Sequence, residues 1–340
     1  MNNISIIRRS LLVVVVLVGC TAPREKTWED GVVLPNQCNL FSFSPRLDRV
    51  TYICDDDFWL APLPNLEDAT QIAPSFDDSS IQWSVYDWKP DGAAFLIKSY
   101  DRTKDIEGWW LFTVENPNDM LHLCALPSRE RVVEWSPASN AFVVIAQGGG
   151  TVLVHADGSG CEELPFSGLI MRTPAVSWSP DGQSIAYADF SEDTTEVRVL
   201  DLSARQIISV YNGAYLTEWF PNGKEIALFG AKEVIPVVRA DGSGLVKEVE
   251  IPEGYVVNTS RGNKWSPDGS KLALYLKIAS PDYKPIAVGI LDLSTLTISA
   301  HEIDSNVDEI LAWTPEGDAL VGLATGDNGR LFLKEIPVAP

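Results

Sequence analysis

Trp178-Ser179-Pro180-Asp181-Gly182, followed by the apolar residues Ile185-Ala186-Tyr187, is the stretch that decides the fold of this 340-residue chain. It recurs unchanged at Trp265-Ser266-Pro267-Asp268-Gly269, and with two substitutions at Trp219-Phe220-Pro221-Asn222-Gly223. Looser copies begin at Phe43, Trp88, Trp135 and Trp313. The seven copies begin 41 to 48 residues apart. A near-constant period in the forties, built of short strands, indicates the blades of a β-propeller.

Each copy is expected to form a tight turn between two strands. Proline fixes φ at the first corner, Asp or Asn accepts hydrogen bonds from nearby backbone amides, and glycine supplies a positive φ. In the copy at Trp135, which lacks the glycine, we expect Asn140 to hold the left-handed position. The copy at Phe43 has Arg46-Leu47-Asp48 instead, which predicts a turn of different construction. The repeated aspartates are therefore interpreted as turn caps and not as catalytic residues.

The tryptophan of each copy is predicted to pack between neighbouring blades, with its ring nitrogen donating to a backbone carbonyl. One blade cannot bury both of its faces, so the copies must stack. The sequence therefore predicts an all-β, seven-bladed β-propeller of four-stranded antiparallel blades. The last copy lacks its outermost strand, and Gly31-Val32-Val33-Leu34 is well placed to supply it. Such an N-terminal strand would close the last blade and hide its edge.

The repeat resembles the TolB-like propeller repeat, a relative of the WD-type blade. A second landmark agrees with the recurring turn: Val199-Leu200-Asp201-Leu202-Ser203 and Ile290-Leu291-Asp292-Leu293-Ser294 close the third strand of their blades. Asp157-Gly158-Ser159-Gly160 and Asp241-Gly242-Ser243-Gly244 close it in two others. The resemblance covers residues 31–340. It departs from the family in number, because TolB itself is taken as six-bladed and seven copies are present here.

The first residues indicate a signal peptide. Arg8 and Arg9 precede the apolar core Leu11–Val18, which is too short to span a bilayer, since a helix needs about 20 residues. The core ends in Leu17-Val18-Gly19-Cys20, which resembles the lipobox of bacterial lipoproteins. The alternative is an ordinary signal peptide with an incidental cysteine.

The lipobox resemblance implies cleavage before Cys20 and lipid attachment to that residue. Residues 1–19 are then the lipoprotein signal peptide, residues 20–30 a tether and residues 31–340 the propeller. The implied location is extracytoplasmic, with a lipid anchor in the membrane, on the periplasmic or the cell-surface side. Which membrane and leaflet carry the anchor is left open.

The composition excludes several functions. The formal net charge is −21, which argues against a nucleic-acid partner and favours cationic partners, divalent ions or simply solubility. The three histidines stand apart from one another, and no spacing suggests a zinc or iron site. No Gly-x-Ser-x-Gly nucleophile motif is present.

Four cysteines remain once Cys20 is assigned to lipid. Cys38 and Cys54 lie on either side of the first turn, on strands expected to pair, and an exported chain retains disulfides, so a bridge between them is predicted. Cys124 and Cys161 fall near the fourth strands of successive blades. We expect these two to be buried apolar side chains and leave their pairing open.

Propeller topology predicts an acidic face, here called the loop face. Links between second and third strands, and links between blades, emerge on it, whereas the repeat turns emerge on the opposite face. The candidate binding residues there are Asp55, Asp56, Asp57, Tyr100, Asp101, Asp105, Glu192, Asp193 and Tyr283. Such a face suits a cationic peptide, a protein, a glycan or a divalent ion. The alternative is a solvated loop face without a ligand. No cofactor is required, calcium is a candidate ligand, and the metal content is left open.

The leading hypothesis is a monomeric, lipid-anchored propeller that acts as a protein- or ligand-binding or assembly module at the cell envelope. Its partner would be an envelope protein or glycan. The alternative is a propeller enzyme that acts on glycans through carboxylates at the centre of the ring, because paired acids suffice for that chemistry.

Overall fold

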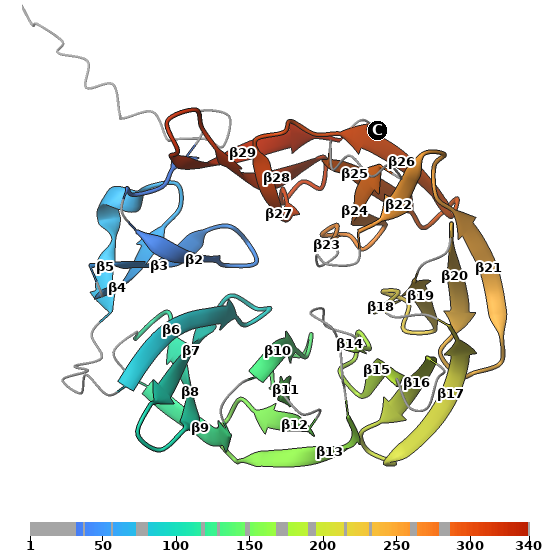
Figure 1. Ribbon diagram of the computed structural model, residues 1–340, viewed down its shortest axis with the longest axis horizontal. Coiled ribbons are helices and arrows are strands. Elements are labelled where there is room, and N and C mark those ends of the chain that lie inside the picture. Colours follow the sequence, from blue (N-terminus) through green and yellow to red (C-terminus); the bar gives the residue numbers. More distant parts are fainter. Residues whose placement is uncertain are drawn as a thin grey trace, which may run out of the picture.

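The chain forms a closed ring of seven β-sheets in a computed structural model (Figure 1). The structure describes residues 32–36, 38–55, 57–72, 81–116, 120–127, 130–146, 150–167, 176–189, 195–213, 216–230, 233–258, 264–278 and 286–338. Within these ranges the regular structure is strand, apart from one short 3-10 turn at Leu66–Asp68. No helix in them has the length and apolar character that a membrane span needs.

Each blade is named by its place in the chain. Blade 1 contains β2 (Asn39–Phe43), β3 (Arg49–Cys54), β4 (Asp57–Pro62) and β5 (Thr70–Ile72). Blade 2 contains β6 (Ile81–Trp88), β7 (Ala94–Asp101), β8 (Ile106–Thr113) and β9 (Met120–Pro127). Blade 3 contains β10 (Glu130–Trp135), β11 (Ala141–Ala146), β12 (Gly150–His155) and β13 (Cys161–Ser167). Blade 4 contains β14 (Val176–Trp178), β15 (Ser184–Asp189), β16 (Glu196–Asp201) and β17 (Gln206–Asn212).

The remaining blades follow the same plan. Blade 5 contains β18 (Leu216–Trp219), β19 (Glu225–Phe229), β20 (Val234–Arg239) and β21 (Leu245–Glu250). Blade 6 contains β22 (Tyr255–Val257), β23 (Lys264–Trp265), β24 (Lys271–Ile278), β25 (Ile286–Asp292) and β26 (Thr297–Glu302). Blade 7 contains β27 (Val307–Trp313), β28 (Ala319–Thr325), β29 (Leu331–Pro337) and β1 (Val32–Val33).

The strands of blades 1 to 6 pair in chain order and antiparallel, with the first strand innermost and the last at the rim, and in blade 7 the rim strand is β1 (Figure 1). In blade 6 the inner strand is interrupted, and both β22 and β23 pair with β24. The predicted seven-bladed, four-stranded antiparallel propeller is therefore confirmed.

The ring closes in blade 7, where the first strand of the chain joins the last. Val32 pairs with Leu333 and Val33 with Phe332. The Leu34 amide then donates to the Leu331 carbonyl at 3.0 Å. The predicted closure by an N-terminal strand is confirmed for these residues.

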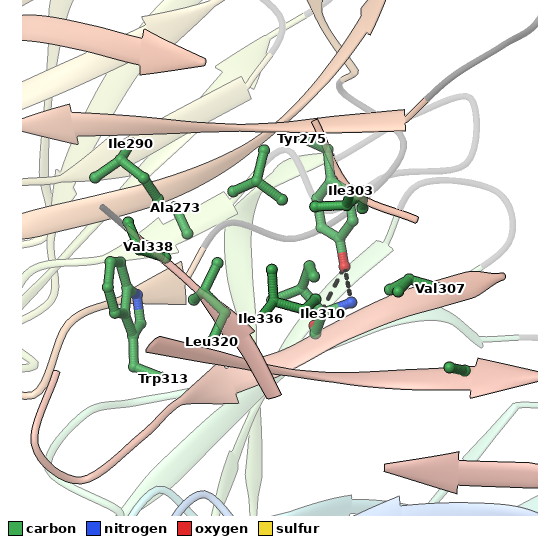
Figure 2. Packing of buried hydrophobic residues seen from close by; sticks show 12 residues of the cluster. Ala273, Tyr275, Ile290, Ile303, Val307, Ile310, Trp313, Leu320, Ile336 and Val338 are labelled. Atoms are coloured by element: carbon green, nitrogen blue, oxygen red, sulfur yellow. Dashed lines mark hydrogen bonds between the residues drawn. The ribbon is translucent and has the colours of Figure 1, made fainter. Parts of the chain in front are cut away.

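The hydrophobic core lies mainly between the blades. Figure 2 shows the cluster between blades 6 and 7, where Tyr275 of β24 meets Ile310 of β27. The Tyr275 hydroxyl donates to the Ile310 carbonyl at 3.2 Å and accepts from the Ile310 amide. Leu320 is fully buried in the same cluster. Stacking therefore buries apolar faces that no single blade could cover by itself.

The repeat turns follow the predicted chemistry. Ser179 donates to the Asp181 carboxylate at 2.6 Å, and that carboxylate accepts from the Gln183 amide at 3.0 Å. Gly182 holds a φ of 67°, a left-handed value that glycine adopts without steric cost. The interpretation of these aspartates as turn caps is confirmed.

Two expectations about the turns without glycine are wrong. In the copy at Trp135 the left-handed residue is Ser139, with a φ of 57°, and not Asn140. In the copy at Phe43, Leu47 takes this conformation with a φ of 53°. Its amide donates to the Ser44 carbonyl at 2.9 Å, as in the glycine-containing turns, so the construction is the same. Leu47 is almost fully buried in the cluster that contains β1 and β29, and this burial offsets its backbone strain.

Two disulfides join the four described cysteines. Cys38 is bonded to Cys54, with their Cα atoms 4.4 Å apart. Cys124 of β9 is bonded to Cys161 of β13, with Cα atoms 6.6 Å apart. The pairing of these two cysteines, which the sequence left open, is therefore a bond between two blades. The rims of blades 2 and 3 approach closely here, because Gly158 in the turn before β13 lies against β9.

Candidate functional site

The residue directly before the aromatic of each repeat is here called the axial residue, because it lies on the innermost strand of its blade (Figure 1). The seven axial residues are Ser42, Asp87, Glu134, Ser177, Glu218, Lys264 and Ala312. Four of them are charged, and three of those four are acids. The repeat thus places a ring of dissimilar side chains around one axis.

Tryptophan side chains fix the backbone at several axial residues. Trp88 donates through Nε1 to the Ser42 carbonyl at 3.0 Å, and Trp178 donates to the Glu134 carbonyl at 3.1 Å. Trp313 donates to the Lys264 carbonyl at 2.8 Å. In each case the indole reaches the axial residue of the preceding blade. The predicted bond from ring nitrogen to carbonyl is confirmed for these three.

The other tryptophans of the repeat differ. Trp265 donates through Nε1 to the Glu218 side chain, Oε1, at 2.8 Å instead of to a carbonyl. The Nε1 atoms of Trp135 and Trp219 are buried and have no hydrogen-bond partner among the described residues. For these three residues the predicted bond to a carbonyl is wrong. In blade 6 the indole is thus held by a carboxylate that also belongs to the axial ring.

The charged axial residues interact across the axis. Glu134 of blade 3 experiences the charges of Glu218 in blade 5, Asp87 in blade 2 and Lys264 in blade 6. Asp87 and Lys264 also interact with each other. Blades 2 and 6 are not neighbours, and neither are blades 3 and 5, so these interactions pass through the middle of the ring.

Enclosure by protein raises the pKa of two axial acids. Burial, followed by the negative charges of Glu218 and Asp87, raises the pKa of Glu134 to about 8, and Lys264 opposes this rise. Burial raises the pKa of Asp87 to about 6, against the Trp88 amide, which donates to it at 2.8 Å, and against Lys264. At neutral pH Glu134 is therefore mostly protonated and Asp87 mostly ionised.

A cavity of about 910 Å³ opens beside this ring, on the face of the repeat turns. Trp88, Trp265 and Trp313 contribute to its lining, with repeat-turn prolines such as Pro90 and Pro267, and of the three tryptophans only Trp265 is more than slightly exposed. Its charged lining residues are Arg46, Asp87, Lys264 and Glu309. Here called the axial cavity, it combines aromatic walls with both signs of charge, the composition expected of a site for a polar ligand with apolar parts.

The structure separates the predicted loop-face residues into two groups. Asp55 and Asp57 are exposed beside the link between β3 and β4. Tyr100 donates to Asp105 at 2.8 Å, and both lie near the link between β7 and β8. The residues Cys20, Asp56, Glu192, Asp193 and Tyr283 lie outside the described residues.

Asp101 stabilises its own turn. Its carboxylate accepts from the Thr103 amide at 2.9 Å and pairs with Lys104 at 2.8 Å. Bonds from Lys104 first, and then from Thr103, hold the pKa of Asp101 well below its ordinary value. These partners give it a structural role. In the described ranges, no group of three His, Cys, Asp or Glu residues is arranged to hold a metal ion.

The axial residues were not among the site residues predicted from the sequence. The signal was present, because they occupy one fixed position in every repeat, directly before the recurring aromatic residue of the motif. Their role as a site depends on the closed ring, because only the closed ring brings together residues that are far apart in the sequence. The axial cavity also lies on the face opposite the predicted loop face.

One curated relative matches part of the chain. Protein TolB homolog of Chlorobium luteolum is 31% identical over 144 residues, covering 41% of this chain and 30% of the relative. The chain therefore matches less than a third of that relative's length. No protein-family model matches the chain. Together with the seven-bladed ring, the match shows that the chain contains TolB-like propeller repeats.

Solved structures share the architecture. A chain of a mitotic checkpoint complex is 15% identical with a TM-score of 0.56, covering 99% of this chain and 100% of that one. The β-propeller domain of Cps50 (Swd1) from Myceliophteria thermophila is 12% identical with a TM-score of 0.56, covering 90% and 99%. An oligogalacturonate lyase in complex with manganese is 14% identical with a TM-score of 0.53, covering 72% of both chains. At such low identity these likenesses show the fold alone.

Proposed function

We propose that this protein is a lipid-anchored propeller of the cell envelope that binds a segment of a partner protein in its axial cavity. The observation that carries the proposal is the preformed cavity of about 910 Å³ beside the axial acids. The TolB-like repeats support a protein-binding role at the envelope. A ring closed by its own first strand is a rigid frame, which lowers the entropic cost of binding.

The lining of the axial cavity suits a peptide segment. Trp265, which is partly exposed, offers rigid aromatic surface, and tryptophan is one of the residue types that dominate binding energy at protein interfaces. Asp87 and Lys264 offer one charge of each sign within the same space. A segment with apolar and charged side chains would therefore find a complement for both.

Photo-crosslinking tests this site. A photoreactive amino acid at position 312 would stand inside the cavity, because Ala312 lines it. A matched control at position 246 would stand on the outermost strand of blade 5, where Val246 is exposed. We expect a partner adduct, identified by mass spectrometry, from position 312 and none from position 246. Adducts from position 246 alone would contradict the proposal.

The lipid anchor has a separate test. Wild-type protein should take up labelled fatty acid and fractionate with membranes, whereas Cys20→Ser should do neither. Labelling that persists in the variant would remove the anchor from the proposal and leave the binding site unaffected.

A second candidate is glycan hydrolysis, favoured by one observation. Glu134 is held protonated while Asp87 is mostly ionised, and glycosidases need one protonated and one ionised carboxyl group. Release of reducing ends from envelope glycans, abolished in both Glu134→Gln and Asp87→Asn, would establish the enzyme. If no envelope glycan releases reducing ends, the hydrolase candidate is excluded and the binding function remains.

A further inference from the structure

The axial acids also indicate which chemical class of ligand the cavity binds and how that binding depends on pH. Asp87 lines the cavity directly, and Glu134 feels the charges of both Asp87 and Lys264. A charge placed in the cavity beside Asp87 would therefore act on both acids. Glu134 is mostly protonated at neutral pH, and without it the acids Asp87, Glu218 and Glu309 still outnumber the bases Arg46 and Lys264, so the surroundings favour a positive occupant.

We propose that the axial cavity takes a basic side chain of the partner segment and that this binding is linked to protons, because the bound cation requires ionised carboxylates where protons would otherwise sit. The inference rests on the proposed function and adds to it the chemical class of the ligand and a dependence on pH. Lysine and arginine fit this role because they stay charged over the range in which the axial acids titrate.

The groups that face the two acids come from the whole ring. Glu218 of β18 and Lys264 of β23 carry charge toward Glu134. The Trp88 amide donates to Asp87, and Arg46 and Glu309 complete the charges of the cavity wall. The remaining axial residues, Ser42, Ser177 and Ala312, are uncharged.

Two steps are therefore expected in the affinity for a cation. Asp87, with its pKa raised to about 6, loses its proton first and adds a negative charge to the cavity wall. Glu134, with its pKa raised to about 8, loses its proton at higher pH and adds a negative charge that interacts with Asp87 and Lys264. For one displaced proton the association constant rises about tenfold per pH unit below the pKa of the group and levels off above it.

The probe is a blocked peptide, acetyl-Gly-Lys-Gly-Lys-Gly-amide, titrated calorimetrically from pH 5 to pH 9 at constant ionic strength. Its control is the same peptide with norleucine in place of both lysines. We expect the affinity of wild-type protein for the lysine peptide to rise roughly tenfold from pH 5 to pH 7 and further to pH 9. The norleucine peptide should show no such rise.

Neutral variants separate the two steps. Asp87→Asn should lose the rise below pH 7, and Glu134→Gln should keep that rise and lose the one above it. Glu248→Gln, an exposed acid on β21, is the charge-matched control and should behave as wild type. Infrared spectra at pH 7 provide a readout without peptide: the band of a protonated carboxyl should be absent from Glu134→Gln.

The possible results distinguish a failure of the proton linkage from a failure of the proposed binding function. If both rises in affinity occur and each is lost in its own variant, the proton linkage and the binding cavity are both supported. Lysine peptide bound with the same affinity from pH 5 to pH 9 overturns the proton linkage and leaves a binding cavity. A peptide that does not bind at any pH overturns the cavity as a site for basic segments, and the linkage with it.

Discussion

At the scale of single residues, the turn chemistry could be predicted and the exceptions could not. Asp181 caps its turn and Gly182 adopts a positive φ, as their residue types predict, because both are local requirements of the turn. Leu47 breaks the local rule, and only its burial against the closing strands explains why it is tolerated. Ser139 replaces the expected Asn140 because the left-handed position is fixed by its distance from the aromatic.

The raised pKa of Glu134 predicts how stability depends on pH. Because the folded protein binds the proton more tightly than the ordinary value of 4.5, this group contributes fully below about pH 4.5. Its contribution is lost as pH rises through about 8. Glu134→Gln should therefore raise the melting temperature relative to wild type by roughly a few degrees at pH 9 and by less at pH 5. Equal differences at both pH values would contradict the assignment, and Glu248→Gln is the control.

Trp178 and Trp219 form a matched pair for the indole bond. Each is 6% exposed, yet Trp178 donates to the Glu134 carbonyl and Trp219 has no partner among the described residues. Replacement by Phe removes similar volume from both. Trp178→Phe should cost about 0.5–1.5 kcal/mol more free energy of unfolding than Trp219→Phe, because it also removes a hydrogen bond. Urea denaturation measures both, and equal costs would show that the bond contributes nothing.

At the scale of elements, the sequence indicated which segment closes the ring. The last repeat lacked one strand, and an unpaired apolar segment preceded the first repeat, so simple counting led to β1. The bond between Cys124 and Cys161 could not be found in this way. It depends on how closely the rims of neighbouring blades approach, which is a property of the assembled ring.

Deleting residues 32–34 tests the closing strand. The loss would expose Leu333, which is fully buried, and leave the edge of β29 without its partner. An unpaired edge pairs with other chains, so we expect concentration-dependent association by analytical ultracentrifugation. Val33→Thr is the control, because Val33 is 52% exposed and its backbone pairing is kept. A monomeric deletion variant with unchanged stability would refute a role in closure.

At the scale of the whole molecule, the number of blades followed from seven copies of one motif, and the functional centre did not. The predicted binding acids lie in the links between strands, and Asp101 among them caps its own turn. The axial acids lie within the strands themselves. Asp87 and Glu134 belong to separate repeats, and they become one electrostatic unit only because the ring brings them to a common axis.

The central claim, that ligands bind in the axial cavity, is tested most directly by the indole N–H signals in an NMR titration with the lysine peptide at pH 8. Trp88, Trp265 and Trp313 line the cavity, whereas Trp135, Trp178 and Trp219 belong to the same motif but do not line it. We predict that the signals of the first three shift on binding and that those of the other three stay in place. Shifts confined to the second group, or to tryptophans outside the repeat motif, would contradict the claim.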